Sequence, residues 1–232
     1  MAGETTTIQT KDGTFSAYVA RPASTPAAAI VVIQEIFGVN KVMRDIADDY
    51  AAQGYLAICP DLFWRIEPGV DITDQSEAEW KKAFELYNAF DVDTGVQDIQ
   101  ATIEAVRADP GCNGKVGAVG FCLGGLLAFL TATRTDADAA VSYYGVGIEK
   151  HTAEAEKLAH PLMLHIAEED QFVPKPAQEV ILQALKNHPQ IQIHTYPGRD
   201  HAFARVGGEH YDAADATTAN QRSAAFFADA LK

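Results

Sequence analysis

The sequence predicts an α/β fold in which helices cover both faces of a mostly parallel sheet. Three observations lead to this prediction: apolar runs of strand length recur along the chain, helix-patterned segments separate them, and 47% of the 232 residues are hydrophobic. Strands that alternate with helices form βαβ units, and their right-handed crossovers place the strands parallel. Because the chain shows no linker, internal repeat or low-complexity tract, we expect a single domain over residues 1–232.

The chain opens with an expected antiparallel hairpin at one edge of the sheet. Two alternating runs, Thr7–Thr10 and Phe15–Val19, flank the dipeptide Asp12-Gly13, which is typical of a hairpin turn. The runs that follow are continuously apolar, as strands buried on both faces are. They are Ala29–Ile33, Leu56–Cys59, Val116–Val119, Ala139–Tyr143 and Leu162–Ile166. The last run, Ile191–Tyr196, alternates more strongly and is expected toward the opposite edge.

Helix patterns fill most of the sequence between these runs. The helical segments are Val42–Gln53, Thr94–Ala108, Leu123–Arg134, Pro176–Lys186 and Ala214–Leu231. Gly54 stands at the expected C-cap of the first, and Pro110 lies just beyond the second. The segment Leu62–Glu79 is irregular and rich in Asp, Glu, Pro and Gly. We expect it to cross the top of the sheet as a partial lid.

The excess of acidic residues argues against several classes of partner. The chain has 32 Asp and Glu residues against 18 Lys and Arg residues, a formal net charge of -14. Such a surface repels the phosphates of nucleic acids and anionic lipids, and it disfavours an anionic substrate unless Arg or Lys lies at the site. We therefore expect a small-molecule substrate, no nucleic-acid or membrane partner, and a monomer or homodimer.

Cysteine usage and the N-terminus indicate a reduced, cytoplasmic protein. The three cysteines, Cys59, Cys112 and Cys122, suit neither a disulfide framework nor a zinc-type CxxC pair. No basic segment followed by an apolar one opens the chain, and the longest apolar runs are too short to span a bilayer. We expect neither a metal nor a cofactor.

The segment most informative about chemistry is Gly120–Gly124, Gly-Phe-Cys-Leu-Gly, between a buried strand and an apolar helix. A nucleophile between glycines in this context matches the nucleophile elbow of α/β-hydrolases, with Cys122 as nucleophile. The glycines let strand and helix approach closely, and the helix N-terminus favours a thiolate and a substrate oxyanion. The alternatives are a structural cysteine in a Gly-rich turn and a loose dinucleotide fingerprint. The latter would require G-x-G-x-x-G at the first βα turn.

Two later strand ends supply candidate partners for Cys122. Asp170 and His201 follow the last two predicted strands, so the chain order is nucleophile, acid, base, as in α/β-hydrolases. We predict that His201 is the general base and that Asp170 orients its imidazole. Asp170 could instead be only a helix N-cap, and other acids nearby could take its role: Glu168, Glu169 and Asp200. The histidines within predicted strands are expected to be satisfied core or sheet-face residues: His165 and His194.

The loop Gln34–Asn40, after the first buried strand, is predicted to contribute to an oxyanion hole. In this fold one N–H comes from the residue after the nucleophile and another from this loop, so Leu123 and Ile36 are the expected donors. Glu35 is unusual here, because a carboxylate near a strand end must be solvated or paired. It belongs either to the site or to a salt bridge on the surface.

Together, several of these segments resemble the dienelactone hydrolase (carboxymethylenebutenolidase) family of α/β-hydrolases over nearly the whole chain. They are Gln34–Asn40, Cys59–Leu62, Gly114–Gly117, Gly120–Gly125, Tyr143–Gly147 and His201–Arg205. The resemblance implies an α/β-hydrolase that cleaves an ester or lactone with a triad of Cys122, His201 and Asp170.

The resemblance also implies roles for residues outside the triad. Glu35 matches a glutamate that contacts the thiol at rest and helps to form the thiolate once substrate binds. Ile36 and Leu123 match the backbone donors of the oxyanion hole. Arg205 matches an arginine that binds the substrate carboxylate, which would supply the local positive charge that the acidic composition lacks.

Two departures from the family bear on the substrate. Dienelactone-cleaving members carry a second arginine where this chain has Trp80, and a tyrosine where it has Phe84. Losing a guanidinium and a hydroxyl weakens recognition of an anion, and an indole enlarges the apolar contact surface. We expect Trp80, Phe84, Phe37 and Arg205 to line the substrate pocket, and the substrate to be a more neutral or bulkier ester than dienelactone.

The leading hypothesis is covalent hydrolysis through a thioester at Cys122. A thiolate suits activated substrates, so we expect enol lactones, aryl esters or aryl phosphotriesters. One alternative is a non-catalytic binder that keeps the pocket for a small lactone-like ligand. Another is a redox-sensing thiol, which would need a resolving cysteine near Cys122.

Overall fold

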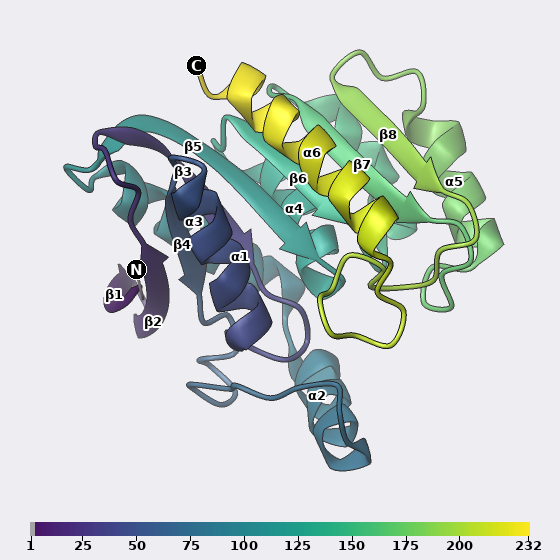
Figure 1. Ribbon diagram of the computed structural model, residues 1–232, viewed down its shortest axis with the longest axis horizontal. Coiled ribbons are helices and arrows are strands. Elements are labelled where there is room, and N and C mark those ends of the chain that lie inside the picture. The colour runs from purple at the N-terminus through teal and green to yellow at the C-terminus, as the bar shows by residue number, and fades with distance from the viewer. Residues whose placement is uncertain (1–2) are drawn as a thin grey trace. The chain divides into compact units, whose positions relative to one another are not determined.

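The computed structural model describes residues 3–232, and the chain divides into two compact units, Met1–Ala118 and Val119–Lys232 (Figure 1). The boundary falls within strand β5, Cys112–Phe121. Strands and helices alternate after the first hairpin, as the sequence predicts. No helix within residues 3–232 is long and apolar enough to cross a membrane.

The strands of the first unit pair in the order β1-β2-β4-β3. They are β1 (Glu4–Thr10), β2 (Gly13–Ala20), β3 (Ala27–Ile33) and β4 (Leu56–Pro60). The first two form the predicted antiparallel hairpin, whose turn includes Gly13 at a φ of 147°. β2 pairs antiparallel with β4, and β4 pairs parallel with β3. The side chains of β3 are almost all buried, as its unbroken apolar run predicts.

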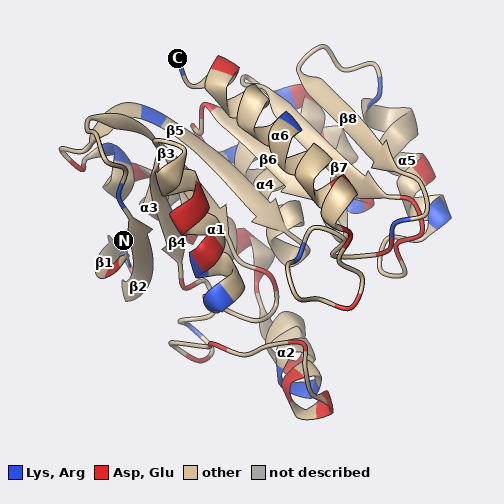
Figure 2. Cartoon of the chain, viewed as in Figure 1, with Lys and Arg blue, Asp and Glu red and all other residues tan. Residues whose placement is uncertain are grey.

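Three helices complete the first unit: α1 (Lys41–Ala52), α2 (Glu77–Ala89) and α3 (Val92–Arg107). Asn40 caps α1 by accepting a hydrogen bond from Met43 N at 3.2 Å. Gly54 lies one residue after the C-cap, with a φ of 98°, where a left-handed residue commonly ends a helix. Acidic residues gather along α1 in Figure 2, in keeping with the negative net charge.

The irregular segment predicted over Leu62–Glu79 ends earlier than expected, because α2 begins at Glu77. The Ser76 side chain accepts a hydrogen bond from Glu79 N at 3.3 Å, and the Glu79 carboxylate accepts one from the Ser76 hydroxyl at 2.8 Å. This reciprocal pairing stabilises the first turn of the helix. Upstream, the Asp61 carboxylate accepts hydrogen bonds from the backbone N–H groups of Phe63 and Gly69, at 3.1 and 2.7 Å, and so fixes the loop.

The second unit has three parallel strands, in the order β6-β7-β8. They are β6 (Ala139–Tyr143), β7 (Leu162–Ala167) and β8 (Ile191–Tyr196), with helices α4 (Leu123–Arg134), α5 (Lys175–Leu185) and α6 (Ala213–Ala230). Two short 3₁₀ helices, η1 (Ile148–Lys150) and η2 (Thr152–Lys157), follow β6. In Figure 1, α6 lies across the near face of β6 and β7. Nearly every residue of α4 is buried, so this helix belongs to the core.

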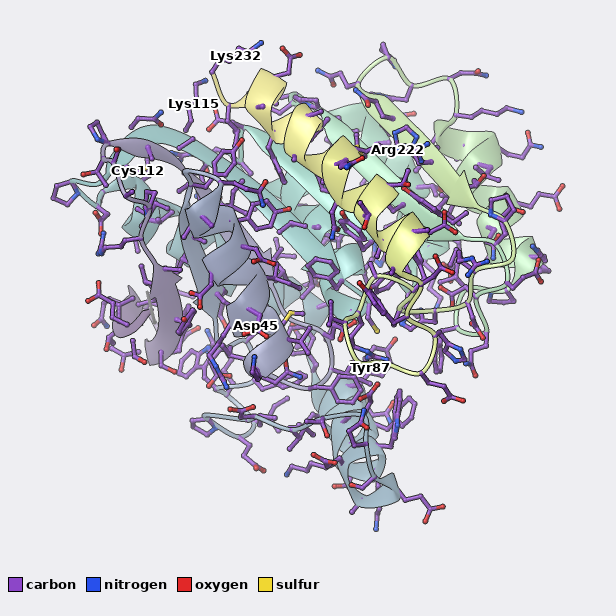
Figure 3. All side chains as sticks on the ribbon, viewed as in Figure 1. Asp45, Tyr87, Cys112, Lys115, Arg222 and Lys232 are labelled. Carbon is purple, nitrogen blue, oxygen red and sulfur yellow. The ribbon has the colours of Figure 1, made fainter. Side chains whose placement is uncertain are left out.

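His165 is a satisfied core residue, as the sequence predicts. Its Nδ1 lies 2.8 Å from the Tyr196 hydroxyl and its Nε2 lies 3.0 Å from Ser223 Oγ. Burial lowers the pKa of His165 well below the usual value, and the positive charges of His194 and Arg222 lower it further. Arg222, on α6 in Figure 3, donates to the Tyr196 hydroxyl at 3.2 Å. This network therefore holds a neutral imidazole in the core.

Candidate active site

Cys122 lies in a strained turn between β5 and α4. Its φ of 57° and ψ of -115° are rare for a residue with a side chain, and strain of this kind is common at functional sites. The surrounding backbone holds the turn in place: Cys122 N donates to Tyr143 O at 3.1 Å, and Cys122 O accepts from Gly125 N at 3.0 Å. Leu123 is the first helical residue, so its N–H has no acceptor within the helix and points toward the helix N-terminus.

The glycines around Cys122 are required by close backbone packing. A Cβ on Gly120 would lie 1.9 Å from Gly124 O, and one on Gly125 would lie 2.5 Å from Tyr143 O. Both separations are far shorter than any allowed contact, so only glycine fits at these positions. The structure therefore confirms the prediction that glycines here let the strand and the helix approach closely.

Asp170 and His201 meet at the ends of β7 and β8. His201 Nδ1 lies 2.9 Å from Asp170 Oδ2 and 3.1 Å from Asp170 Oδ1, and both side chains are buried. Asp170 Oδ1 also accepts hydrogen bonds from the backbone N–H groups of Phe172 and Val173, at 2.8 and 3.1 Å. These bonds fix the carboxylate, which in turn fixes the orientation of the imidazole.

Two of the competing acids are engaged elsewhere. Asp200 Oδ1 accepts hydrogen bonds from the backbone N–H groups of Gln171 and His201, at 3.1 and 2.6 Å, and so ties two loops together. Glu169 forms an exposed ion pair with Lys175. Within residues 3–232, the carboxylate that is hydrogen-bonded to the His201 ring belongs to Asp170.

The protonation of His201 depends on Cys122. Burial by itself lowers the pKa of His201, but the interactions of its ring with Cys122 and Asp170 outweigh that effect. The electrostatic interaction with Cys122 is the largest of these, and Asp170 contributes through both its hydrogen bond and its charge. Together they raise the pKa of His201 to about 10. The surroundings of His201 thus favour the protonated imidazolium.

We expect the His201 imidazole to stay protonated well above neutral pH in the wild-type protein. In Cys122→Ala the largest cause that raises its pKa is removed, so the midpoint of an imidazole ¹⁵N NMR titration falls to lower pH. Because the folded pKa is raised above 6.5, the imidazolium stabilises the folded protein fully below about pH 6.5, and this contribution is lost as the pH rises through about 10. Equal midpoints in the two proteins would contradict this interaction between His201 and Cys122.

Two aromatic side chains that were not singled out in the sequence pack against His201. The ring of Phe172 lies 4.8 Å from the imidazole and that of Tyr144 lies 5.1 Å from it, both edge-on. Tyr144 also has a left-handed backbone, with a φ of 39°. Two signals in the sequence could have identified these residues. Tyr144 directly follows a buried strand, and Phe172 comes two residues after Asp170.

The first unit holds the other predicted residues in a buried loop and an aromatic cluster. Glu35 is only 1% exposed, so the alternative of a surface salt bridge is wrong. Ile36 and Phe37 are also buried. Gln34 fixes this loop, because its Oε1 accepts from Leu62 N at 3.0 Å and its Nε2 donates to Glu35 O at 3.3 Å.

Three residues predicted to line the substrate pocket contact one another. Trp80 lies edge-on to Phe37, with ring centres 5.1 Å apart, and it stacks on Phe84 at 5.6 Å. The indole of Trp80 donates to Asp74 O at 2.9 Å, which fixes the ring. In the second unit, Arg205 is buried in the turn after His201, and its backbone N–H donates to Ala202 O at 2.9 Å.

Comparisons with known proteins identify the family. The profile of the dienelactone hydrolase family matches residues 15–231. A protein of Azospirillum brasilense named "Putative carboxymethylenebutenolidase" is 52% identical over 227 residues, which cover 93% of this chain and 94% of that protein. The carboxymethylenebutenolidase of Pseudomonas putida is 44% identical over 229 residues, covering 98% of this chain and 97% of that protein.

A solved structure agrees with these relatives. The "Putative Dienelactone Hydrolase" of Klebsiella pneumoniae subsp. pneumoniae MGH 78578 superposes with a TM-score of 0.85 at 28% identity, covering 97% of this chain and 98% of that one. The predictions of the family, of the α/β-hydrolase fold and of a hydrolase are thus confirmed. This chain belongs to the dienelactone hydrolase family and is a hydrolase with the α/β-hydrolase fold.

Proposed function

We propose that this protein hydrolyses activated esters or enol lactones through a thioester on Cys122, with His201 and Asp170 completing a catalytic triad. The observation that carries the proposal is the buried pair of His201 and Asp170, with Nδ1 and Oδ2 2.9 Å apart, in the same unit as the strained turn that holds Cys122. A thiolate is a ready nucleophile, whereas a neutral thiol is a weak one, so in this proposal the thiolate forms once substrate binds, with the help of Glu35.

The reaction proceeds in two steps. The Cys122 thiolate attacks the carbonyl carbon, and the Leu123 N–H stabilises the oxyanion. The His201 imidazolium gives its proton to the leaving oxygen, which yields an alcohol or enol and a thioester. The neutral imidazole then takes a proton from water, whose oxygen attacks the thioester and releases the carboxylic acid. Asp170 holds the ring in the required orientation throughout.

The roles of Glu35, Ile36 and Arg205 are part of the same proposal. Ile36 would supply the second oxyanion N–H, Glu35 would help to form the thiolate, and Arg205 would bind an anionic group of the substrate. The burial of Glu35 supports a role in the site, because an acidic side chain at 1% exposure needs a compensating function or partner.

Trapping the covalent intermediate tests the proposal. Wild-type protein quenched during turnover of p-nitrophenyl acetate is digested and analysed by mass spectrometry. We expect one acetyl group per chain, on Cys122. Acetylation of a different residue, or product release at the buffer rate with no acetylated protein, would overturn the mechanism and favour the non-catalytic small-ligand binder.

We expect Trp80→Arg to shift the substrate preference toward dienelactone. The aromatic cluster of Phe37, Trp80 and Phe84 presents an apolar surface, and Phe84 is 39% exposed. A guanidinium at position 80 adds a bidentate donor for a carboxylate, so kcat/KM on dienelactone relative to p-nitrophenyl acetate rises about tenfold or more.

The matched control is Trp80→Phe, which removes the indole without adding a charge and leaves the ratio near the wild-type value. The full panel also includes a dialkyl aryl phosphate, which tests the phosphotriester alternative. An unchanged ratio in Trp80→Arg would show that Trp80 does not contact the acidic end of the substrate.

A further inference from the structure

Ser142, on β6, has a buried hydroxyl that the proposed reaction does not use. The side chain is 1% exposed, and its Oγ has no hydrogen-bond partner in the described part of the chain. An unsatisfied buried hydroxyl costs free energy, so it needs an explanation. The neighbouring Tyr143 hydroxyl, by contrast, bonds Ser223 and Asn220 on α6.

The pleat of β6 explains why Ser142 is outside that network. Successive side chains of a strand point to opposite faces, so Tyr143 points toward α6 and Ser142 points away from it. On this other face Ser142 lines a small cavity together with Tyr144, Asp170, Val173 and Ile181. The cavity is therefore lined both by the Ser142 hydroxyl, which has no hydrogen-bond partner in the described residues, and by Asp170, the acid of the proposed triad.

The cavity has room for one water molecule, and although its lining is mainly apolar, it includes polar groups that can bind one. Its volume is about 10 Å³, close to the roughly 10–15 Å³ at which a cavity can hold a water. A buried water also needs at least two polar partners. Ser142 Oγ is one of them. Asp170 Oδ2 is another, because it is bonded to His201 Nδ1 and a carboxylate oxygen can accept a second hydrogen bond.

We propose that this cavity is a binding site for one structural water, which accepts a hydrogen bond from the Ser142 hydroxyl and donates one to Asp170 Oδ2, making Ser142 a positioning residue for the triad. This proposal rests on the proposed function only in assigning Asp170 to the triad. The water offsets part of the charge of Asp170, and so limits how strongly the carboxylate holds the proton on His201.

Ser142→Ala tests the functional part of the proposal. Without the hydroxyl the water is lost or displaced, and the less compensated Asp170 raises the pKa of His201, beside which Cys122 is the other titratable group. His201 must be neutral to activate water, so kcat falls about tenfold with little change in KM, a factor typical of one hydrogen bond to a charged group. The midpoint of the His201 NMR titration moves to higher pH.

Thr131→Val is the matched control, because it removes a buried hydroxyl of the same unit, one that donates to Leu127 O at 2.7 Å and lies outside the cavity. It lowers thermal stability but leaves the His201 titration and kcat unchanged. A kcat within twofold of wild type in Ser142→Ala, together with an unmoved titration, would overturn the positioning role.

A high-resolution crystal structure of the wild-type protein tests the site without reference to activity. We expect one water within hydrogen-bond distance of Ser142 Oγ and Asp170 Oδ2, and its loss or displacement in Ser142→Ala. A dry cavity would overturn the inference even if the enzyme is active. If the water is present and the wild-type protein hydrolyses no ester, the proposed function fails and the water site stands.

Discussion

Replacing Cys122 by alanine is expected to lower kcat on p-nitrophenyl acetate by a factor on the order of 10⁴ or more. The thioester cannot form without the sulfur, so only the acceleration from substrate binding and the oxyanion donors remains. Cys122→Ser is expected to lose most of the activity as well. Its hydroxyl does not ionise at neutral pH, so His201 and Glu35 would face a hydroxyl instead of an easily ionised thiol.

Cys112→Ala is the matched control for this prediction. Cys112 is a partly buried thiol whose Sγ accepts a hydrogen bond from Gly114 N at 3.3 Å, and the proposed mechanism gives it no role. Its kcat should stay at the wild-type value. The third thiol, Cys59, is fully buried, and burial together with the charge of Asp61 raises its pKa, so alkylation of the Cys112→Ala variant at neutral pH should report Cys122. Near-wild-type activity in Cys122→Ser would contradict a site tuned for a thiolate.

Asp170→Asn is expected to lower kcat by roughly 10²–10⁴, as loss of the triad acid does in other hydrolases. The structure gives a specific reason. Asp170 Oδ1 accepts hydrogen bonds from the backbone of Phe172 and Val173, and an asparagine must keep its carbonyl oxygen there. Its NH₂ group then takes the place of Oδ2 and donates to His201 Nδ1. This fixes the proton on Nε2, so the ring can no longer accept a proton on the side of the nucleophile.

The matched control is Asp200→Asn. Asp200 Oδ1 also accepts two backbone hydrogen bonds, which an asparagine oxygen preserves, and it makes no hydrogen bond to the His201 ring. Its kcat should fall by no more than a few fold, with both variants compared at equal thermal stability. If kcat fell strongly in Asp200→Asn and only slightly in Asp170→Asn, Asp200 and not Asp170 would be the acid of the triad.

The sequence by itself determined the order of elements and the turn that carries Cys122. Both follow from local pattern. The apolar runs predicted every strand between β3 and β8, the hairpin turn at Asp12-Gly13 is where the structure has it, and α4 spans the predicted residues Leu123–Arg134. The main error was local too, because the capping by Ser76 that starts α2 at Glu77 lay inside a segment read as irregular.

Only the tertiary structure decided which side chains act on one another. The sequence predicted Asp170 as the acid but left three nearby acids as competitors, and the choice depends on which carboxylate the ends of β7 and β8 bring within 2.9 Å of the His201 ring. The burial of Glu35 and the cavity beside Ser142 are likewise absent from any local pattern. Hydrogen bonds, desolvation and charge act over a few ångströms of space, and residues far apart in the chain reach those distances only once the fold has formed.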